Sequence, residues 1–214
     1  LVENQVQSSY AARNKGISQA VGSLISFVDA NVKVNKDFLQ GIEKFFGINI
    51  VDYLGNRVEI EIIKDSLTAR YNRMTDFSVG SDIRDNHYAP TCCLTVRRSV
   101  FDKVGVFDQR VESGGDWDFG QRVFQANLKQ DYCADIVVYH PARFSYGSLI
   151  KKGKRIARGI SQLSYYSPQE YNHLFKRYFQ IRRYLPRNPL QIYKQYKSMY
   201  NDTTYTHTLA YAFF

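Results

Sequence analysis

Cysteine and acidic side chains are both in short supply in this sequence. The 214 residues include three cysteines, Cys92, Cys93 and Cys133, of which two are adjacent and none has CxxC spacing. This odd number and spacing argue against a disulfide framework or a structural zinc site, and they favour a reducing compartment. The N-terminus does not resemble a signal peptide, and no apolar run is long enough to span a membrane. We therefore expect a cytoplasmic protein.

Acidic residues are outnumbered, with 20 Asp and Glu against 29 Lys and Arg and a net charge of +9. Such a surplus suits an anionic partner, namely a nucleotide phosphate, an acidic membrane face or nucleic acid. The excess is concentrated at 151–187, where Glu170 is the sole acid among many basic residues and tyrosines. That segment could be a solvated helix, bind RNA by stacking and phosphate contacts, or lie on anionic lipid. We favour a peripheral position on the inner face of the plasma membrane.

Strands alternate with helices along the chain, which indicates an α/β fold with a mixed sheet flanked by helices. The apolar patterns predict strands at 24–28, 58–62, 92–96 and 134–139. Helices are expected at 11–21, 35–46 and 99–104, from the acidic loop to about 127, and at 146–160. We expect a short helix within 64–88 and a cap on the 99–104 helix from Ser99. The chain lacks an initiator methionine and ends in the apolar segment 209–214, so we expect a fragment.

The segment GGDWDFGQR at 114–122 is the most informative stretch. Two glycines lead into an expected helix whose first turn carries Asp116 and Asp118 on either side of Trp117, the single tryptophan of the chain. A carboxylate beside an aromatic ring at such a junction suits a general base facing a ring-shaped polar substrate. The alternative is that both acids simply favour the positive end of the helix.

Two further segments carry oxygen and cationic groups suited to a phosphate-bearing ligand. Asp29 and Asn31 follow a buried strand and could hold Mg²⁺ or Mn²⁺ bridged to a diphosphate, although Asp and Asn also form ordinary turns. Arg13 and Asn14 open the first helix and could contact phosphate, or could be a surface Arg and a capping Asn. His140 also follows a predicted strand, the end at which ligands gather in α/β sheets.

Four motifs in one order resemble the family 2 glycosyltransferases, which are inverting enzymes with the GT-A fold. They are ARNKG at 12–16, FVDAN at 27–31, RRSVFDKVGVFD at 97–108 and GDWDFGQR at 115–122. The resemblance covers about residues 8–159, and the motifs look most like those of bacterial or cyanobacterial enzymes of polysaccharide assembly. It implies a partial GT-A-like catalytic domain at 1–145, lacking N-terminal βαβ units, and a basic, Tyr-rich helical extension at 146–214.

The resemblance also implies roles for individual residues. Asp116 would be the catalytic base, and Gly115, Trp117 and Asp118 would shape the acceptor pocket, with Gly115 standing where the family carries Glu. Nucleotide or diphosphate contacts are implied for Arg13, Asn14, Asp29 and Arg143. A metal site is implied for Asp29, Asn31 and His140, with Asn31 in place of the second acid of a DxD-like motif.

The implied partners are a nucleotide-diphosphate sugar, a glycan or lipid-linked acceptor, and Mg²⁺ or Mn²⁺ as cofactor. Two other functions stay open at this point. The Asn31 and Gly115 departures and the missing N-terminal units would suit a non-catalytic, glycosyltransferase-like binding or scaffold protein. Nucleic-acid binding is less favoured, because the sequence contains no recognised nucleic-acid motif.

Overall fold

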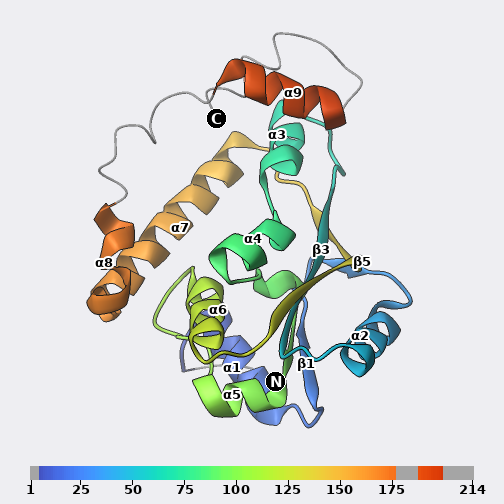
Figure 1. Cartoon of the computed structure of the whole chain (residues 1–214). Coiled ribbons are helices and arrows are strands. Elements are labelled where there is room, and N and C mark those ends of the chain that lie inside the picture. The colour runs from blue at the N-terminus through green and yellow to red at the C-terminus, as the bar shows by residue number, and fades with distance from the viewer. Residues whose placement is uncertain (1–4, 177–187, 200–214) are drawn as a thin grey trace.

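A computed structural model of the chain describes residues 5–176 and 188–199 (Figure 1). Its centre is a five-stranded mixed sheet in the order β1-β4-β3-β5-β2. The strands are β1 Leu24–Phe27, β2 Lys33–Val34, β3 Tyr53–Glu61, β4 Leu94–Arg97 and β5 Gln130–Pro141. The long strands β3 and β5 pair in parallel, whereas every other neighbouring pair is antiparallel. The expected α/β fold with a mixed sheet flanked by helices is confirmed.

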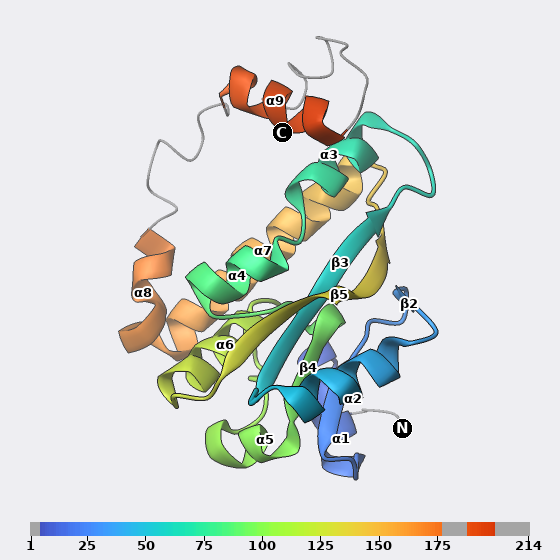
Figure 2. The same cartoon turned by 45° about the vertical axis from the view of Figure 1, so that its right-hand side comes forward.

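Helices cover both faces of this sheet. They are α1 Ser9–Gln19, α2 Phe38–Ile48, α3 Leu67–Thr75, α4 Val79–Asn86, α5 Arg98–Val104, α6 Gly115–Gln125, α7 Tyr146–Tyr166, α8 Pro168–Lys176 and α9 Pro189–Met199, with a 3₁₀ turn η1 at Thr91–Cys93. Figures 1 and 2 show α2 on one side of β3 and β5, and α4, α6 and α7 on the other. The side with three helices carries the cavity described below.

A close approach at Gly55 brings α4 onto β3. A Cβ at this position would lie 2.5 Å from Ile83 Cδ1 and 2.9 Å from Val79 Cγ1, both on α4, so no larger residue fits. Next to it the fully buried Tyr53 hydroxyl donates to the Ala89 carbonyl at 3.2 Å and accepts from the Ala89 N–H at 2.7 Å. These contacts fix the segment that follows α4 against the middle of the sheet.

An aromatic cluster ties α6 to β1 and α5. The rings of Phe27 and Phe107 meet edge to face with centroids 5.4 Å apart, and Phe119 of α6 lies 4.7 Å from Phe107 and 5.3 Å from Phe101. Such pairs contribute about 0.5–1.5 kcal/mol each beyond their area burial. Since Phe119 is fully buried, the start of α6 is held rigidly beside the end of β1.

Several expected boundaries were wrong. The strand expected at 58–62 begins at Tyr53, and the strand expected at 134–139 runs from Gln130 to Pro141, so His140 lies inside β5. The segment 64–88 holds two helices, α3 and α4. Ser99 does not cap α5: the helix starts earlier, its N-cap is Arg97, and no side chain bonds there.

The helix expected at 146–160 is confirmed and continues to Tyr166 as α7. Its N-cap is Ser145, whose hydroxyl accepts from the Ser148 N–H at 3.3 Å. The division at residue 145 into two units stays a prediction. Residues 177–187 and 200–214, including the apolar segment 209–214, lie outside the described part. Within 5–176 and 188–199, no helix combines the length and apolar character needed to cross a bilayer.

Candidate active site

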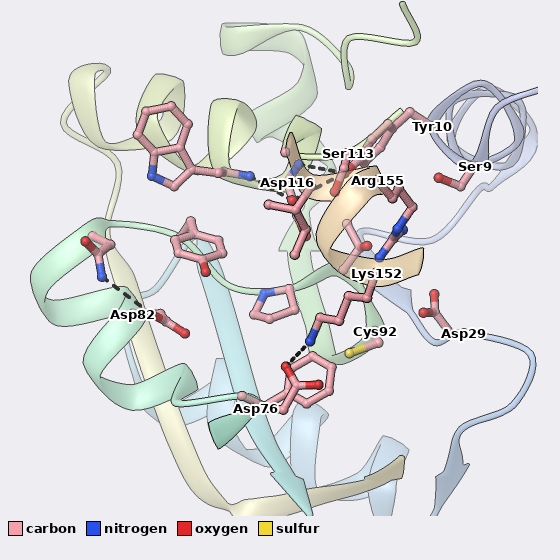
Figure 3. Close-up of a pocket in the computed structure, with 18 of the residues that line it drawn as sticks. Ser9, Tyr10, Asp29, Asp76, Asp82, Cys92, Ser113, Asp116, Lys152 and Arg155 are labelled. Carbon is pink, nitrogen blue, oxygen red and sulfur yellow. Dashed lines mark hydrogen bonds and ion pairs between the residues drawn. The ribbon is translucent and has the colours of Figure 1, made fainter. Parts of the chain in front are cut away.

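A cavity of about 950 Å³ lies between α1, α4, α6 and α7, beside the end of β1 and the end of β5 (Figure 3). Its volume falls within the range typical of small-molecule sites. Most of the predicted site residues line it: Arg13, Asp29, Asn31, Asp116, Trp117, His140 and Arg143. Motifs far apart in the chain therefore meet around one space. The three remaining predicted residues, Asn14, Gly115 and Asp118, do not line it.

Asp116 lies in the first turn of α6 with an unusual cap. The N-cap, Gly114, has a left-handed φ of 84° and supplies no side chain. Instead the Tyr10 hydroxyl, from α1, accepts from the Gly115 N–H at 3.0 Å and from the Asp116 N–H at 3.4 Å. The same hydroxyl donates to Asp116 Oδ1 at 3.3 Å, a contact drawn in Figure 3. Tyr10 thus caps the helix and orients the carboxylate at once.

The electrostatics of Asp116 suit a proton acceptor. Burial raises the pKa of its carboxyl group, and hydrogen bonds from the Trp117 N–H at 3.0 Å and from Tyr10 partly offset that rise. Burial also raises the pKa of Tyr10, so its phenol keeps the proton that it donates. A base whose pKa is closer to neutrality takes a proton from a hydroxyl more efficiently.

Gly115 leaves room for Tyr10. A Cβ at position 115 would lie 2.9 Å from two carbons of the Tyr10 ring. The glutamate that the family resemblance would place here therefore has no space unless Tyr10 moves. Position 115 and Tyr10 act as one unit in this chain, which gives a physical reason for the glycine.

Trp117 and Asp118 differ in their surroundings. The Trp117 ring lines the cavity and lies 5.0 Å from the Tyr171 ring of α8. Asp118 is buried, pairs with Arg122 at 2.9 Å and accepts from the Tyr171 hydroxyl at 2.7 Å. Both of its oxygens are therefore engaged in joining α6 to its own next turn and to α8, behind Trp117.

Asn14 is similarly occupied. Its amide donates to the Phe107 carbonyl at 2.8 Å and accepts from the Phe107 N–H at 3.1 Å. These two hydrogen bonds to the backbone of Phe107 attach the loop before α6 to α1. In this structure Asn14 therefore has a structural role that does not require a ligand.

The possible metal ligands meet without forming a closed site. Asp29 Oδ1 accepts from Arg13 at 2.7 Å, and the exposed Asn31 lies two residues further on. In the part of the chain that the structure describes, no group of three or more His, Cys, Asp or Glu side chains is arranged to hold a metal ion. These residues fit a cation held by one or two protein groups and by phosphate oxygens, which is the habit of Mg²⁺.

His140 is in the form that a metal ligand requires. Its Nδ1 lies 2.9 Å from the Pro141 carbonyl oxygen, which can only accept, so Nδ1 carries the hydrogen and Nε2 keeps a free lone pair. Burial lowers the pKa of His140, which keeps the imidazole neutral. A backbone carbonyl on the other ring nitrogen is the usual arrangement around ligating histidines.

Sequence reasoning missed other residues of the cavity, among them Tyr10, Asp76, Lys152 and Arg155. Tyr10 sits next to the ARNKG motif but meets Asp116 across 106 positions of the chain. Lys152 and Arg155 were counted only as members of a basic stretch. No local pattern marks any of these four as part of a site.

The chain is similar in sequence to several curated proteins. AglE, a glycosyltransferase of Haloferax volcanii, is 33% identical over 165 residues, which cover 76% of this chain and 54% of AglE. The pre-mycofactocin glycosyltransferase of Mycobacterium tuberculosis is 25% identical over 141 residues, covering 62% of this chain and 30% of that protein. The sequence relatives are glycosyltransferases. The chain spans about half the length of AglE, and no protein-family model matches it.

Two solved structures share the fold. S. aureus TarS, in complex with UDP-GlcNAc, superposes with a TM-score of 0.50 at 18% identity, over 67% of this chain and 42% of that one. The mannosyltransferase PcManGT of Pyrobaculum calidifontis, in complex with GDP-Man and Mn²⁺, gives 0.51 at 13% identity, over 75% and 45%. The fold is GT-A-like.

Proposed function

We propose that the chain belongs to an inverting, family 2 type glycosyltransferase that moves a sugar from a nucleotide-diphosphate sugar to a hydroxyl group. The acceptor would be a glycan or a lipid-linked sugar in polysaccharide or cell-surface glycan synthesis. One observation carries the proposal: a half-buried carboxylate with a raised pKa, Asp116, shares a cavity with the Arg13–Asp29 pair. The glycosyltransferase relatives and the nucleotide sugars bound by TarS and PcManGT support it.

The reaction would be a single displacement. A sugar hydroxyl is a poor nucleophile at neutral pH, so Asp116 accepts its proton while the oxygen bonds to the anomeric carbon of the donor. The bond from that carbon to the diphosphate breaks on the opposite face, which inverts the centre. Asp116 needs no acidic partner to protonate the leaving group, unlike the paired carboxylates of glycosidases. The ring of Trp117 would face the acceptor sugar.

Negative charge grows on the departing diphosphate and has to be stabilised. Arg13, 18% exposed and facing the cavity, can offer its guanidinium to phosphate oxygens. Mg²⁺ or Mn²⁺, held by Asp29 with Asn31 or His140, would supply further positive charge when bound. Stabilisation of this kind is usually the largest single contribution to such a rate.

A non-catalytic binding protein is the second candidate. It is favoured by two departures from the family pattern: Asn31, exposed and uncharged, in place of an acid, and Gly115, where the Tyr10 ring fills the space. Such a protein would bind nucleotide sugars without turnover.

The test compares Asp116→Asn with the native full-length protein for release of UDP or GDP, using UDP-GlcNAc and GDP-Man with Mn²⁺. We expect the variant to bind donor normally and to turn over about 10²–10⁴-fold more slowly, the usual share of a general base. Asp37→Asn is the matched control, because Asp37 is an exposed N-cap residue without a side-chain cap bond. The anomeric configuration of the product, read by NMR, tests inversion.

Three results would count against the proposal. Equal turnover by Asp116→Asn and native protein would remove Asp116 as the base. A retained anomeric configuration would exclude the single displacement. Donor binding without turnover across a wider donor panel would favour the binding protein instead.

A further inference from the structure

Helix α7 forms one wall of the cavity. Five of its side chains line the space: Lys152, Arg155, Ile156, Ile160 and Leu163. The helix is seated closely, since a Cβ at Gly159 would lie only 2.2 Å from the Ser113 carbonyl oxygen, and Leu163 is 2% exposed. The wall is therefore fixed to the loop that leads into Asp116, although α7 begins after the four sequence motifs.

The charges on this wall are unbalanced. Lys152 Nζ donates to Asp76 Oδ1, as Figure 3 shows, while Arg143 Nη1 is 3.7 Å from Asp76 Oδ2, too far for a hydrogen bond. Arg155 also lines the cavity, and it has no hydrogen-bond or ion-pair partner among the described residues. Lys152 and Arg143 thus share the Asp76 carboxylate, and Arg155 brings a third positive charge to the same cavity.

One of these cations has an unmet hydrogen bond. Arg143 Nη1 is buried and without any hydrogen-bond partner. A buried donor left unpaired costs about 1–3 kcal/mol, and more if it is charged. Burial lowers the pKa of the Lys152 ammonium group, the Asp76 carboxylate offsets part of that fall, and the nearby Arg143 and Arg155 add to it. A multivalent anion would relieve both, because each phosphate oxygen can accept from several donors.

The position of the wall selects the kind of anion. Lys152 and Arg155 line the same cavity as Asp116 and the Arg13–Asp29 pair (Figure 3). A compact ligand with two linked phosphates can span such a group. A nucleic-acid duplex or a lipid bilayer surface cannot enter a cavity of about 950 Å³.

We propose that α7 completes a diphosphate subsite, in which Lys152 and Arg155 bind the phosphate oxygens together with Arg143. The inference rests on the proposed function for its ligand, the diphosphate of a nucleotide sugar. It makes Lys152 and Arg155 binding residues of the site, and it gives part of the basic stretch at 151–187 a role inside the cavity.

The test is calorimetric binding of inorganic pyrophosphate, UDP and GDP to the native full-length protein and its variants, at low salt, with and without Mn²⁺. Lys152→Met should bind pyrophosphate about 10–100-fold more weakly, as expected for loss of a hydrogen bond to a charged group. Arg155→Gln should weaken it several-fold, and the double variant should lose more than either. Lys154→Gln is the matched control, since Lys154 is exposed on the same helix and does not line the cavity.

Each outcome bears on the subsite separately from the transferase activity. If the double variant binds pyrophosphate and UDP as Lys154→Gln does, the subsite is refuted even where the native protein turns over donor. Equal losses in Lys154→Gln and Lys152→Met would show diffuse surface attraction, which also overturns it. If pyrophosphate binding depends on Lys152 and Arg155 but no donor is turned over, the subsite stands and the proposed function fails. Arg155 is exposed, so its variant should fold whatever becomes of Lys152→Met.

Discussion

The Tyr10→Phe substitution tests the hydrogen bonds that join α1 to the start of α6. The substitution removes one oxygen atom and keeps the ring, which also packs 5.7 Å from Phe107. The lost hydroxyl is the acceptor for the Gly115 and Asp116 N–H groups and a donor to the Asp116 carboxylate. The variant should therefore change stability and the titration of Asp116 together.

The stability change can be estimated from the contacts. The Gly115 N–H belongs to the first turn of α6, has no side-chain cap from Gly114, and is buried. Loss of a helix cap costs about 0.5–2 kcal/mol, and an unpaired buried donor costs about 1–3 kcal/mol. Because both figures describe the same lost bond, we expect about 1–2 kcal/mol. For a chain of this size that corresponds to a fall in Tm of about 2–8 °C, measured by circular dichroism.

The expected change in activity comes from the altered pKa of the Asp116 carboxyl group. The Tyr10 hydrogen bond lowers the pKa of Asp116, so its loss raises that pKa further. In the proposed mechanism the ionised form of Asp116 is the base, so the acid limb of the kcat profile should move to higher pH while the plateau above it is largely kept. Measurement of kcat against pH for both proteins checks this.

Tyr165→Phe serves as the control, since Tyr165 is 79% exposed and should change stability by less than about 0.5 kcal/mol. Our reasoning fails if Tyr10→Phe melts like the native protein. It also fails if the acid limb stays in place or moves to lower pH.

Two further substitutions, at Asp116 and at Gly159, should change the stability of the protein. Burial raises the pKa of Asp116 in the folded state, so the fold binds its proton more tightly than the unfolded chain does, and stability falls as pH rises from the unfolded pKa to the folded one. Asp116→Asn should therefore unfold at higher urea than native protein at pH 7, with the advantage absent near pH 3; a less stable variant at pH 7 would contradict this. Gly159→Ala forces its methyl group to within 2.2 Å of the Ser113 carbonyl, and should cost about 1–3 kcal/mol in a urea melt and weaken pyrophosphate binding, whereas Gly153→Ala, with open space, should do neither.

The sequence predicted best the elements whose signals are local. The α6 motif, the β1 strand and the apolar face of α2 were recognisable because the pattern that indicates each one lies within about a dozen consecutive residues. The first half of β3 was not, since Gly55 and Asn56 are poor strand formers in isolation. Gly55 is required there by α4, whose Val79 and Ile83 come close to the backbone, and that requirement is visible only in the fold.

The same distinction holds for the candidate site. Asp116, Asp29 and Arg13 stand in short recognisable motifs, and the structure brings them to one cavity. Tyr10 and Lys152 carry no such signal, because each gains its role from a partner far along the chain. Asp118 shows the converse: it belongs to the motif, but its carboxylate is engaged by Arg122 and Tyr171.

The parallel pairing of β3 with β5 has a consequence for how the chain folds. These are the two longest strands, and α3, α4, β4, α5 and α6 all lie between them in the sequence. The two strands cannot pair through contacts between residues close in sequence. Their pairing therefore forms only after the intervening chain has become compact. Proteins with such distant pairings fold slowly and expose strand edges for longer. Recovery from denaturant should therefore depend on protein concentration, with dilute refolding giving the higher yield of native protein.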